Sequence, residues 1–168
     1  MSDGIDFPET ARMYPHHFKG EGQFVAKFQD KRMPEQSCIK EGKTNLNKEQ
    51  KQLWDDFVKK HLKLPLDGLL QVFGDNLYLL PRGLPDLSKV KIARNGLHLG
   101  IFKKKRFEPS FALGIALTSD EVVSSIELTQ EQFAQYASGN VVTLDQTLEN
   151  GWYQLLVDGN GFGFAKVI

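Results

Sequence analysis

The chain has 168 residues, of which 40% are hydrophobic and 25% are charged, and its formal net charge is zero. This composition is ordinary for a soluble globular protein with room for one core or two small ones. No apolar run approaches the roughly 20 residues of a membrane-spanning helix, and the single cysteine, Cys38, excludes an internal disulfide framework. We therefore expect a cytoplasmic protein that does not contact membranes.

Charge is distributed unevenly along the chain. Residues 1–106 hold 20 lysines and arginines against 13 acidic residues, whereas residues 107–168 hold one lysine against eight acidic residues. Such asymmetry is typical of a protein in which one part meets a polyanion. Two solvated faces without a charged partner explain the distribution equally well from charge alone.

The first predicted element is a strand at residues 22–28 (GQFVAKF), where apolar and polar side chains alternate. A single strand cannot form a domain. We therefore expect residues 1–32 either to be disordered or to pair with the C-terminal domain or a second molecule. The polar stretch at residues 30–47, which contains one proline and one glycine, predicts a linker.

The clearest helix is predicted at residues 47–62. Its apolar side chains recur at helical spacing and form one stripe, made of Leu53, Trp54, Phe57, Val58, His61 and Leu62. Asn47 followed by Gln50 resembles a capping box, which fixes the start of the helix. Pro65 marks its end.

Short strands follow the helix. Turn signals predict three strand pairs, at 69–73 with 77–80, at 90–93 with 97–102, and at 151–157 with 162–167. The apolar run at residues 111–117 fits a buried helix and a buried strand equally well. Thr129 with Gln132 predicts the capped start of another short helix. Helices interleaved with hairpins, without repeated βαβ units, predict an α+β fold whose final third tends towards a small barrel.

No motif for catalysis, cofactor binding or metal binding is found. The glycine-rich residues 159–163 join two predicted strands, so a hairpin turn is favoured over a phosphate-binding loop. His16 and His17 are adjacent and cannot easily share one ion. Cys38 has neither a CxxC partner nor a neighbouring activating base. We predict no catalytic, cofactor-binding or metal residue on this chain.

The remaining signal is basic. Residues 89–106 contain seven lysines and arginines and no acidic residue, and four of the basic residues are consecutive. Phosphate contacts from such a cluster give salt-dependent affinity without sequence preference. The alternative is a solvated loop. The flanking Phe102 and Phe107 could stack on bases, although core packing is favoured, and Glu108 could hold Arg106 in an ion pair. The predicted nucleic-acid contacts are Lys91, Arg94, Lys103, Lys104, Lys105 and Arg106.

Three segments resemble one enzyme family in the family's own order. Residues 11–26 (ARMYPHHFKGEGQFVA) resemble the end of the Rossmann-like catalytic domain of the Sun (NOL/NOP/Sun) RNA cytosine-5 methyltransferases. Residues 77–110, with LYLLP, GLP, RNGLHLG and KKKRFEPS, resemble the C-terminal extension of the RsmF branch. Residues 151–166 are similar to the PUA-like module that ends these enzymes.

The resemblance implies methyl transfer from S-adenosylmethionine to C5 of a cytosine in ribosomal RNA. The family uses one cysteine in a Thr-Cys context and a second cysteine after a proline, and it binds the cofactor with an upstream glycine loop. Neither cysteine context occurs here, since Cys38 follows Ser37. No catalytic role is therefore assigned, S-adenosylmethionine is expected to be bound by the parent enzyme rather than by this chain, and the chain is expected to be a fragment.

The combined prediction divides the chain into four parts. Residues 1–32 are the last strands of the methyltransferase domain, residues 33–47 a linker, residues 48–110 the RsmF-type intermediate domain, and residues 111–168 the PUA-like RNA-binding module. The predicted role in rRNA processing is to grip ribosomal RNA and position a cytosine in the upstream methyltransferase domain. The alternative is a structural module that docks on that domain with little RNA contact, which the acidic last third favours.

Overall fold

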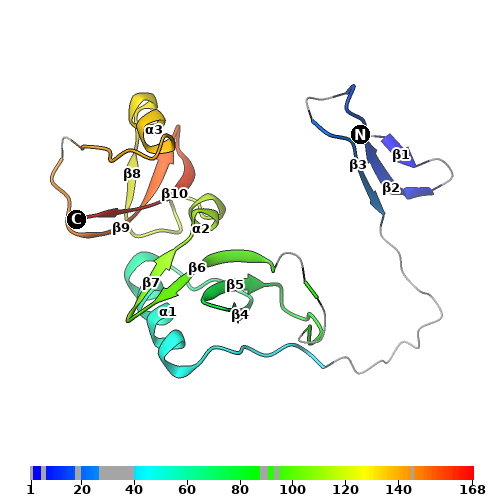
Figure 1. The fold of residues 1–168 in the computed structure, drawn as a ribbon, viewed down its shortest axis with the longest axis horizontal. Coiled ribbons are helices and arrows are strands. Elements are labelled where there is room, and N and C mark those ends of the chain that lie inside the picture. Colours follow the sequence, from blue (N-terminus) through cyan, green and yellow to red (C-terminus); the bar gives the residue numbers. More distant parts are fainter. Residues whose placement is uncertain are drawn as a thin grey trace. The chain divides into compact units, whose positions relative to one another are not determined.

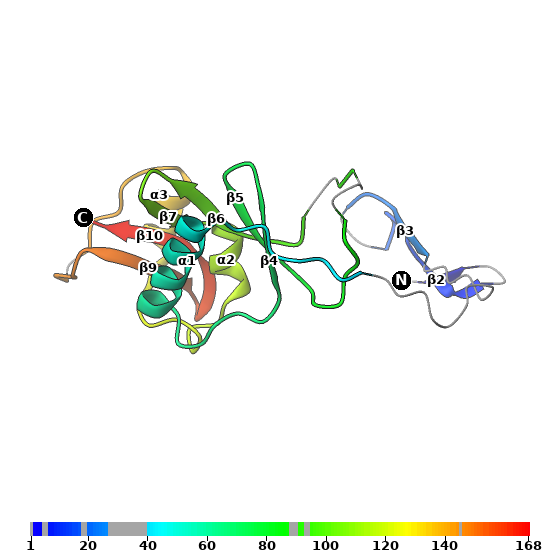
Figure 2. The same ribbon diagram turned by 90° about the horizontal axis from the view of Figure 1, so that it is seen from below.

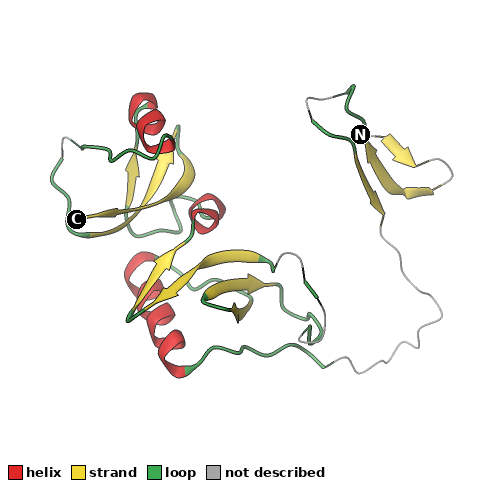
Figure 3. Cartoon of the chain, in the orientation of Figure 1, coloured by secondary structure: helices red, strands yellow, loops and turns green. Residues whose placement is uncertain are grey.

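The computed structural model describes residues 2–4, 7–17, 20–26, 40–87, 91–92, 95–144 and 146–168. The chain forms two compact units, Met1–Cys38 and Ile39–Ile168 (Figure 1). Helices and strands are interleaved along it, as Figure 3 shows, and the predicted α+β class is confirmed. None of the described helices combines the length and the apolar character needed to cross a lipid bilayer.

The first unit holds an antiparallel sheet of β1 (Ser2–Gly4), β2 (Phe7–Met13) and β3 (Gln23–Ala26), in the order β1-β2-β3. β3 coincides with the predicted strand and pairs with β2, Thr10 opposite Ala26. The expectation that this strand is disordered or needs a partner from elsewhere is therefore wrong. Pro8 concealed β2, because proline is rare in central strands. Pro8 falls where the β1–β2 register shifts, so its missing N–H breaks no regular ladder.

Helix α1 (Lys48–His61) opens the second unit and confirms the predicted helix. The capping box is formed in both directions. The Asn47 side chain accepts from the Gln50 backbone at 2.8 Å, and the Gln50 side chain accepts from the Asn47 backbone at 3.0 Å. Trp54 and Phe57 are buried against the neighbouring sheet, which accounts for the apolar stripe.

The neighbouring sheet is antiparallel and contains β4 (Leu69–Phe73), β5 (Asn76–Leu80), β6 (Leu97–Lys103) and β7 (Arg106–Pro109), in that order. The β4–β5 hairpin was predicted and is confirmed. The pairing of 90–93 with 97–102 is wrong, because Lys91 and Ile92 lie in a loop and β6 pairs with β5 and β7. Gly96 explains the difference. A Cβ there would lie 2.3 Å from the Leu79 carbonyl oxygen, so this glycine permits close approach to β5 instead of turning a hairpin.

The last part contains α2 (Phe111–Ala116), β8 (Ser125–Glu127), α3 (Gln130–Ala137), β9 (Gly151–Val157) and β10 (Asn160–Val167). Residues 111–117 are thus mainly helical, and the capped helix and the final hairpin are confirmed. The sheet has the order β10-β9-β8, with β8 parallel to β9. Within the described residues it does not close into a barrel.

Helix α2 lies between the two sheets of the second unit and contacts both β6 and β10 (Figure 1, Figure 2). Gly114 makes this approach possible, since a Cβ there would lie 2.4 Å from the Gly163 backbone. Gln154 is fully buried, and its amide nitrogen donates to the Gly114 and Leu117 carbonyls at 2.9 and 2.7 Å. One apolar cluster then runs from Trp54 to Phe164, so residues from both predicted modules share a core.

Candidate nucleic-acid interface

The four consecutive basic residues form the tip of the β6–β7 hairpin. Lys103 pairs with Arg106 across the ladder, which leaves Lys104 and Lys105 as a two-residue turn. All four are exposed. Lys105 has a φ of 57°, a left-handed conformation that costs a residue with a Cβ roughly 1–2 kcal/mol. A lysine where glycine would fit with less strain suggests that its ammonium group has a role outside the fold.

Two phenylalanines anchor this tip in the core. Phe102 and Phe107 are opposite each other in the ladder, and their ring centroids are 5.3 Å apart. Both are buried, and Phe107 also meets Trp54 of α1 with a centroid distance of 5.2 Å. The core-packing interpretation of these phenylalanines is confirmed, and base stacking is excluded for both. Their packing holds the lysines on a rigid support.

The charges at the tip differ in their partners. Arg106 Nε lies 2.7 Å from Glu108 Oε1, so the predicted ion pair is present and part of the arginine's charge is compensated. The side chains of Lys103, Lys104 and Lys105 make neither a hydrogen bond nor an ion pair with any described residue. The three ammonium groups can therefore meet an anion without breaking an internal interaction.

The two remaining predicted residues are not at the tip. Lys91 is exposed in the loop before β6, and Arg94 lies outside the described residues. β6 runs from Leu97 to Lys103, and six strand residues span about 20 Å. The single surface expected for Lys91 and the tip depended on the hairpin at 90–93, which is not formed. No strand pairing among the described residues therefore brings Lys91 onto one hairpin with the tip.

An aromatic row lies on the sheet face that points away from α1, and sequence reasoning missed it. Tyr78 and His98 are paired across β5 and β6 with ring centroids 4.9 Å apart, and Phe73 lies 5.8 Å from Tyr78. A register shift in β5–β6 places His98 on the same face as Lys103, although an odd spacing of five would put them on opposite faces of a regular strand. The tip and the aromatic row therefore share one face.

The sequence contained a signal for this row. Tyr78 stands between Leu77 and Leu79, and His98 stands between Leu97 and Leu99. The leucines pack into the core, so the alternating aromatic residues must face outward. Tyr78 and His98 are half-buried, and Phe73 is 36% exposed. Their connection with the lysines depends on the register shift, which no local pattern announces.

The described residues offer no group of three histidine, cysteine, aspartate or glutamate side chains that could hold a metal ion. The exposed lysines and aromatic rings among the described residues are instead suited to binding a polyanion that also carries planar groups. Lysine ammonium groups suit phosphates, and exposed rings suit bases.

Two family models match the second unit. The model described as the RsmF rRNA methyltransferase first C-terminal domain matches residues 56–117. The model described as the methyltransferase RsmF PUA domain matches residues 123–168. The first match contains the whole β4–β7 sheet with the lysine tip, together with α2, and the second contains the β8–β10 sheet with α3.

Proposed function

The chain belongs to the RsmF-type ribosomal RNA methyltransferases, as part of their C-terminal region, and on this premise we propose that it binds ribosomal RNA through the β6–β7 tip. By gripping the RNA backbone it positions a target cytosine for the methyltransferase domain upstream. The observation that supports this most strongly is the set of three unpaired lysines on a hairpin anchored by Phe102 and Phe107.

Two kinds of contact follow from the geometry of this face. Lys103, Lys104 and Lys105 contact phosphates, which contribute affinity and carry no base information. Tyr78 and Phe73 lie on the same face and stack on unpaired bases, which is how proteins commonly hold single-stranded RNA. Arg106 contributes less than the lysines, because Glu108 already pairs with it.

The methyl transfer itself is proposed for the upstream domain, which binds S-adenosylmethionine. We expect the 168-residue chain alone to transfer no methyl group, because Cys38 lacks both cysteine contexts of the family. Incubation with labelled S-adenosylmethionine and ribosomal RNA checks this expectation. Incorporation that disappears in Cys38→Ala would contradict it. We propose that this activity takes place in the cytoplasm, as the resemblance to bacterial members of the family implies.

The test of RNA binding is a titration of a short single-stranded rRNA fragment between about 50 and 200 mM salt. Each lost phosphate contact on single-stranded RNA lowers the slope of log K against log salt by roughly 0.7. The triple change Lys103→Ala, Lys104→Ala and Lys105→Ala should therefore flatten the slope by up to about 2. Circular dichroism establishes that the variant is folded.

A matched control removes the same charge elsewhere in the second unit. Lys59, Lys60 and Lys63 are exposed at and just beyond the end of α1. Their triple change to alanine should leave most of the slope intact. Equal flattening by both triple variants would show that net charge matters and the tip does not. An unchanged slope in the tip variant would favour the docking-module alternative.

A further inference from the structure

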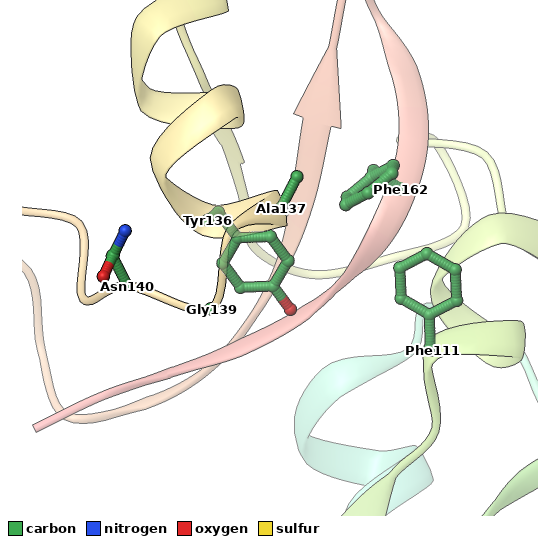
Figure 4. A pocket seen from close by; sticks show the side chains of 6 residues that line it. All are labelled: Phe111, Tyr136, Ala137, Gly139, Asn140 and Phe162. Carbon is green, nitrogen blue, oxygen red and sulfur yellow. The ribbon is translucent and has the colours of Figure 1, made fainter.

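A pocket of about 500 Å³ lies between the start of α2 and the end of α3, against β10 (Figure 4). It takes no part in the proposed phosphate contact. Its lining is aromatic, small or amide-bearing and carries no charge: Phe111, Tyr136, Ala137, Gly139, Asn140 and Phe162. A phosphate would find no cation there, whereas a neutral planar group would find aromatic rings.

Three rings surround Phe162 edge to face. The ring centroids of Phe111, Phe133 and Tyr136 lie 5.0, 4.6 and 5.9 Å from that of Phe162, with interplanar angles of 89°, 88° and 77°. Phe162 is thus held by its neighbours. Phe111 has fewer contacts and remains 50% exposed, so its ring is available to an incoming planar ligand.

Gly163 of β10 lies close to Phe111 and Tyr136, although it is not one of the lining residues. A Cβ at Gly163 would lie 3.1 Å from Phe111 Cδ2 and 3.7 Å from the Tyr136 hydroxyl oxygen, so it would press on the Phe111 ring and force it to shift. Gly163 has no left-handed backbone that would by itself demand glycine. Glycine at this position therefore lets the Phe111 ring keep the place from which it can stack on a base.

Polar groups at the rim are available for hydrogen bonds. The Asn140 side chain bonds to none of the described residues, and the Tyr136 hydroxyl makes one long bond, donating to the Phe164 carbonyl at 3.5 Å. In Figure 4, Tyr136 lies between Asn140 and Phe111. An amide offers both a donor and an acceptor, which suits the edge of a nucleobase.

The pocket is also within reach of the lysine tip. Phe111 follows Arg106 by five residues, so their Cα atoms are at most about 18 Å apart. We propose that the pocket binds one unpaired nucleobase of the RNA whose phosphates contact the tip, stacked on Phe111 with its edge towards Tyr136 and Asn140. This inference rests on the proposed RNA binding and adds a base-binding site to it.

The test uses the full chain and a single-stranded RNA that carries one 2-aminopurine, whose fluorescence falls when it stacks. Loss of one stacked base weakens binding roughly 5- to 150-fold. We expect Phe111→Ala to weaken RNA binding by a factor in this range and to restore the fluorescence. Its salt slope should not change, because stacking releases no counterions. Ile115→Ala is the matched control, since Ile115 lies in the same helix and is 52% exposed but does not line the pocket.

Gly163→Ala supplies a second arm that keeps the Phe111 side chain but displaces its ring with one methyl group. We expect it to weaken binding in the same direction, with the far-ultraviolet circular dichroism preserved. Affinity and fluorescence equal to the control in both Phe111→Ala and Gly163→Ala would overturn the base site, while the tip variant would still test the phosphate contact. If Phe111→Ala weakens RNA binding and the tip variant does not, the base-binding site is supported and the phosphate contact at the tip is rejected.

Discussion

The second unit presents two hairpin tips of the same length with opposite surroundings. Both the β6–β7 and β9–β10 tips are two-residue turns with a non-glycine residue in the left-handed region, Lys105 at 57° and Asp158 at 50°. At the β9–β10 tip, Gln130 donates to the Asp158 carboxylate at 3.0 Å, and the Gly159 N–H donates to Glu127 at 3.1 Å. The lysines of the β6–β7 tip have no such partner among the described residues.

This difference teaches how to separate a structural turn from a binding one. At the β9–β10 tip every strained or charged group is used by a neighbour, so the fold accounts for its sequence. Aspartate also tolerates the left-handed region better than lysine does. At the β6–β7 tip, no contact with a described residue explains the strained backbone of Lys105 or the unpaired lysine charges. Binding of an external anion explains both.

The largest effect on stability should come from a substitution that pushes α2 away from β10. Gly114→Ala places a Cβ 2.4 Å from the Gly163 backbone, so α2 must move away from β10. We expect the free energy of unfolding to fall by about 3 kcal/mol, as overpacking in a core does. Alanine would otherwise favour a helix. Urea denaturation measures the loss, and Gly151→Ala, whose Cβ would meet nothing closer than 3.9 Å, should change little.

Gln154→Met should have the next largest effect. It preserves the volume of the side chain but removes the donor to the Gly114 and Leu117 carbonyls at the end of α2. Buried groups left without partners cost about 1–3 kcal/mol, and we expect a loss of about 2 kcal/mol in thermal or urea unfolding. A variant as stable as the wild type would show that α2 is held by packing alone.

The comparison between the tips is sharpened by one glycine substitution in each. Lys105→Gly relieves left-handed strain and should raise the free energy of unfolding by about 1 kcal/mol while weakening RNA binding. Asp158→Gly relieves less strain and also loses the bond from Gln130, so we expect a change near zero. Both variants are measured by urea denaturation and RNA titration. A Lys105→Gly variant that binds RNA as tightly as the wild type would remove Lys105 from the contact.

The smallest effect concerns the dependence of stability on pH. Burial lowers the pKa of His61, with Lys60 adding to the shift and the Trp152 backbone opposing it. Because the folded state then binds fewer protons than the unfolded chain, stability should fall as the pH drops through the ordinary histidine value of about 6.5. Thermal unfolding at about pH 7.5 and about pH 6 measures this, and His61→Gln should flatten the difference.

The glutamates provide a check on that assignment. Hydrogen bonds from Thr118 lower the pKa of Glu121, and bonds from its own backbone and from Thr129 lower the pKa of Glu131. Their contributions are present above the ordinary value of 4.5 and are lost only as the pH falls below it. A pH dependence above about 6 that persists in His61→Gln would therefore need another group.

The sequence predicted correctly those features that depend on residues close together in the chain. The capping boxes at Asn47 and Thr129 depend on residues three positions apart, and both helices begin where predicted. The predicted pairing of residues 90–93 with 97–102 is wrong. Asn95-Gly96 carries a strong turn signal, whereas in the structure Gly96 allows close packing against Leu79. That contact joins distant segments, so no local pattern could reveal it.

The candidate site divides in the same way. The lysine tip was visible as consecutive residues, and the Arg106–Glu108 pair was visible as near neighbours. The shared face of His98 and Lys103 depends on a shifted register, and the aromatic pocket combines residues from α2, α3 and β10. Tertiary packing brings these residues together, and the hydrophobic periodicity of the sequence carries no information about tertiary packing.

Lysine acetylation read by mass spectrometry, with and without single-stranded ribosomal RNA, tests the central claim most directly. It reports which ammonium groups the RNA covers and requires no substitution. We predict that RNA lowers the acetylation of Lys103, Lys104 and Lys105, while Lys59, Lys60 and Lys63, which are also exposed on the same unit, react as in the free protein. Unchanged acetylation at the tip under saturating RNA, or protection of the α1 lysines instead, would contradict the assignment of the β6–β7 tip as the RNA contact.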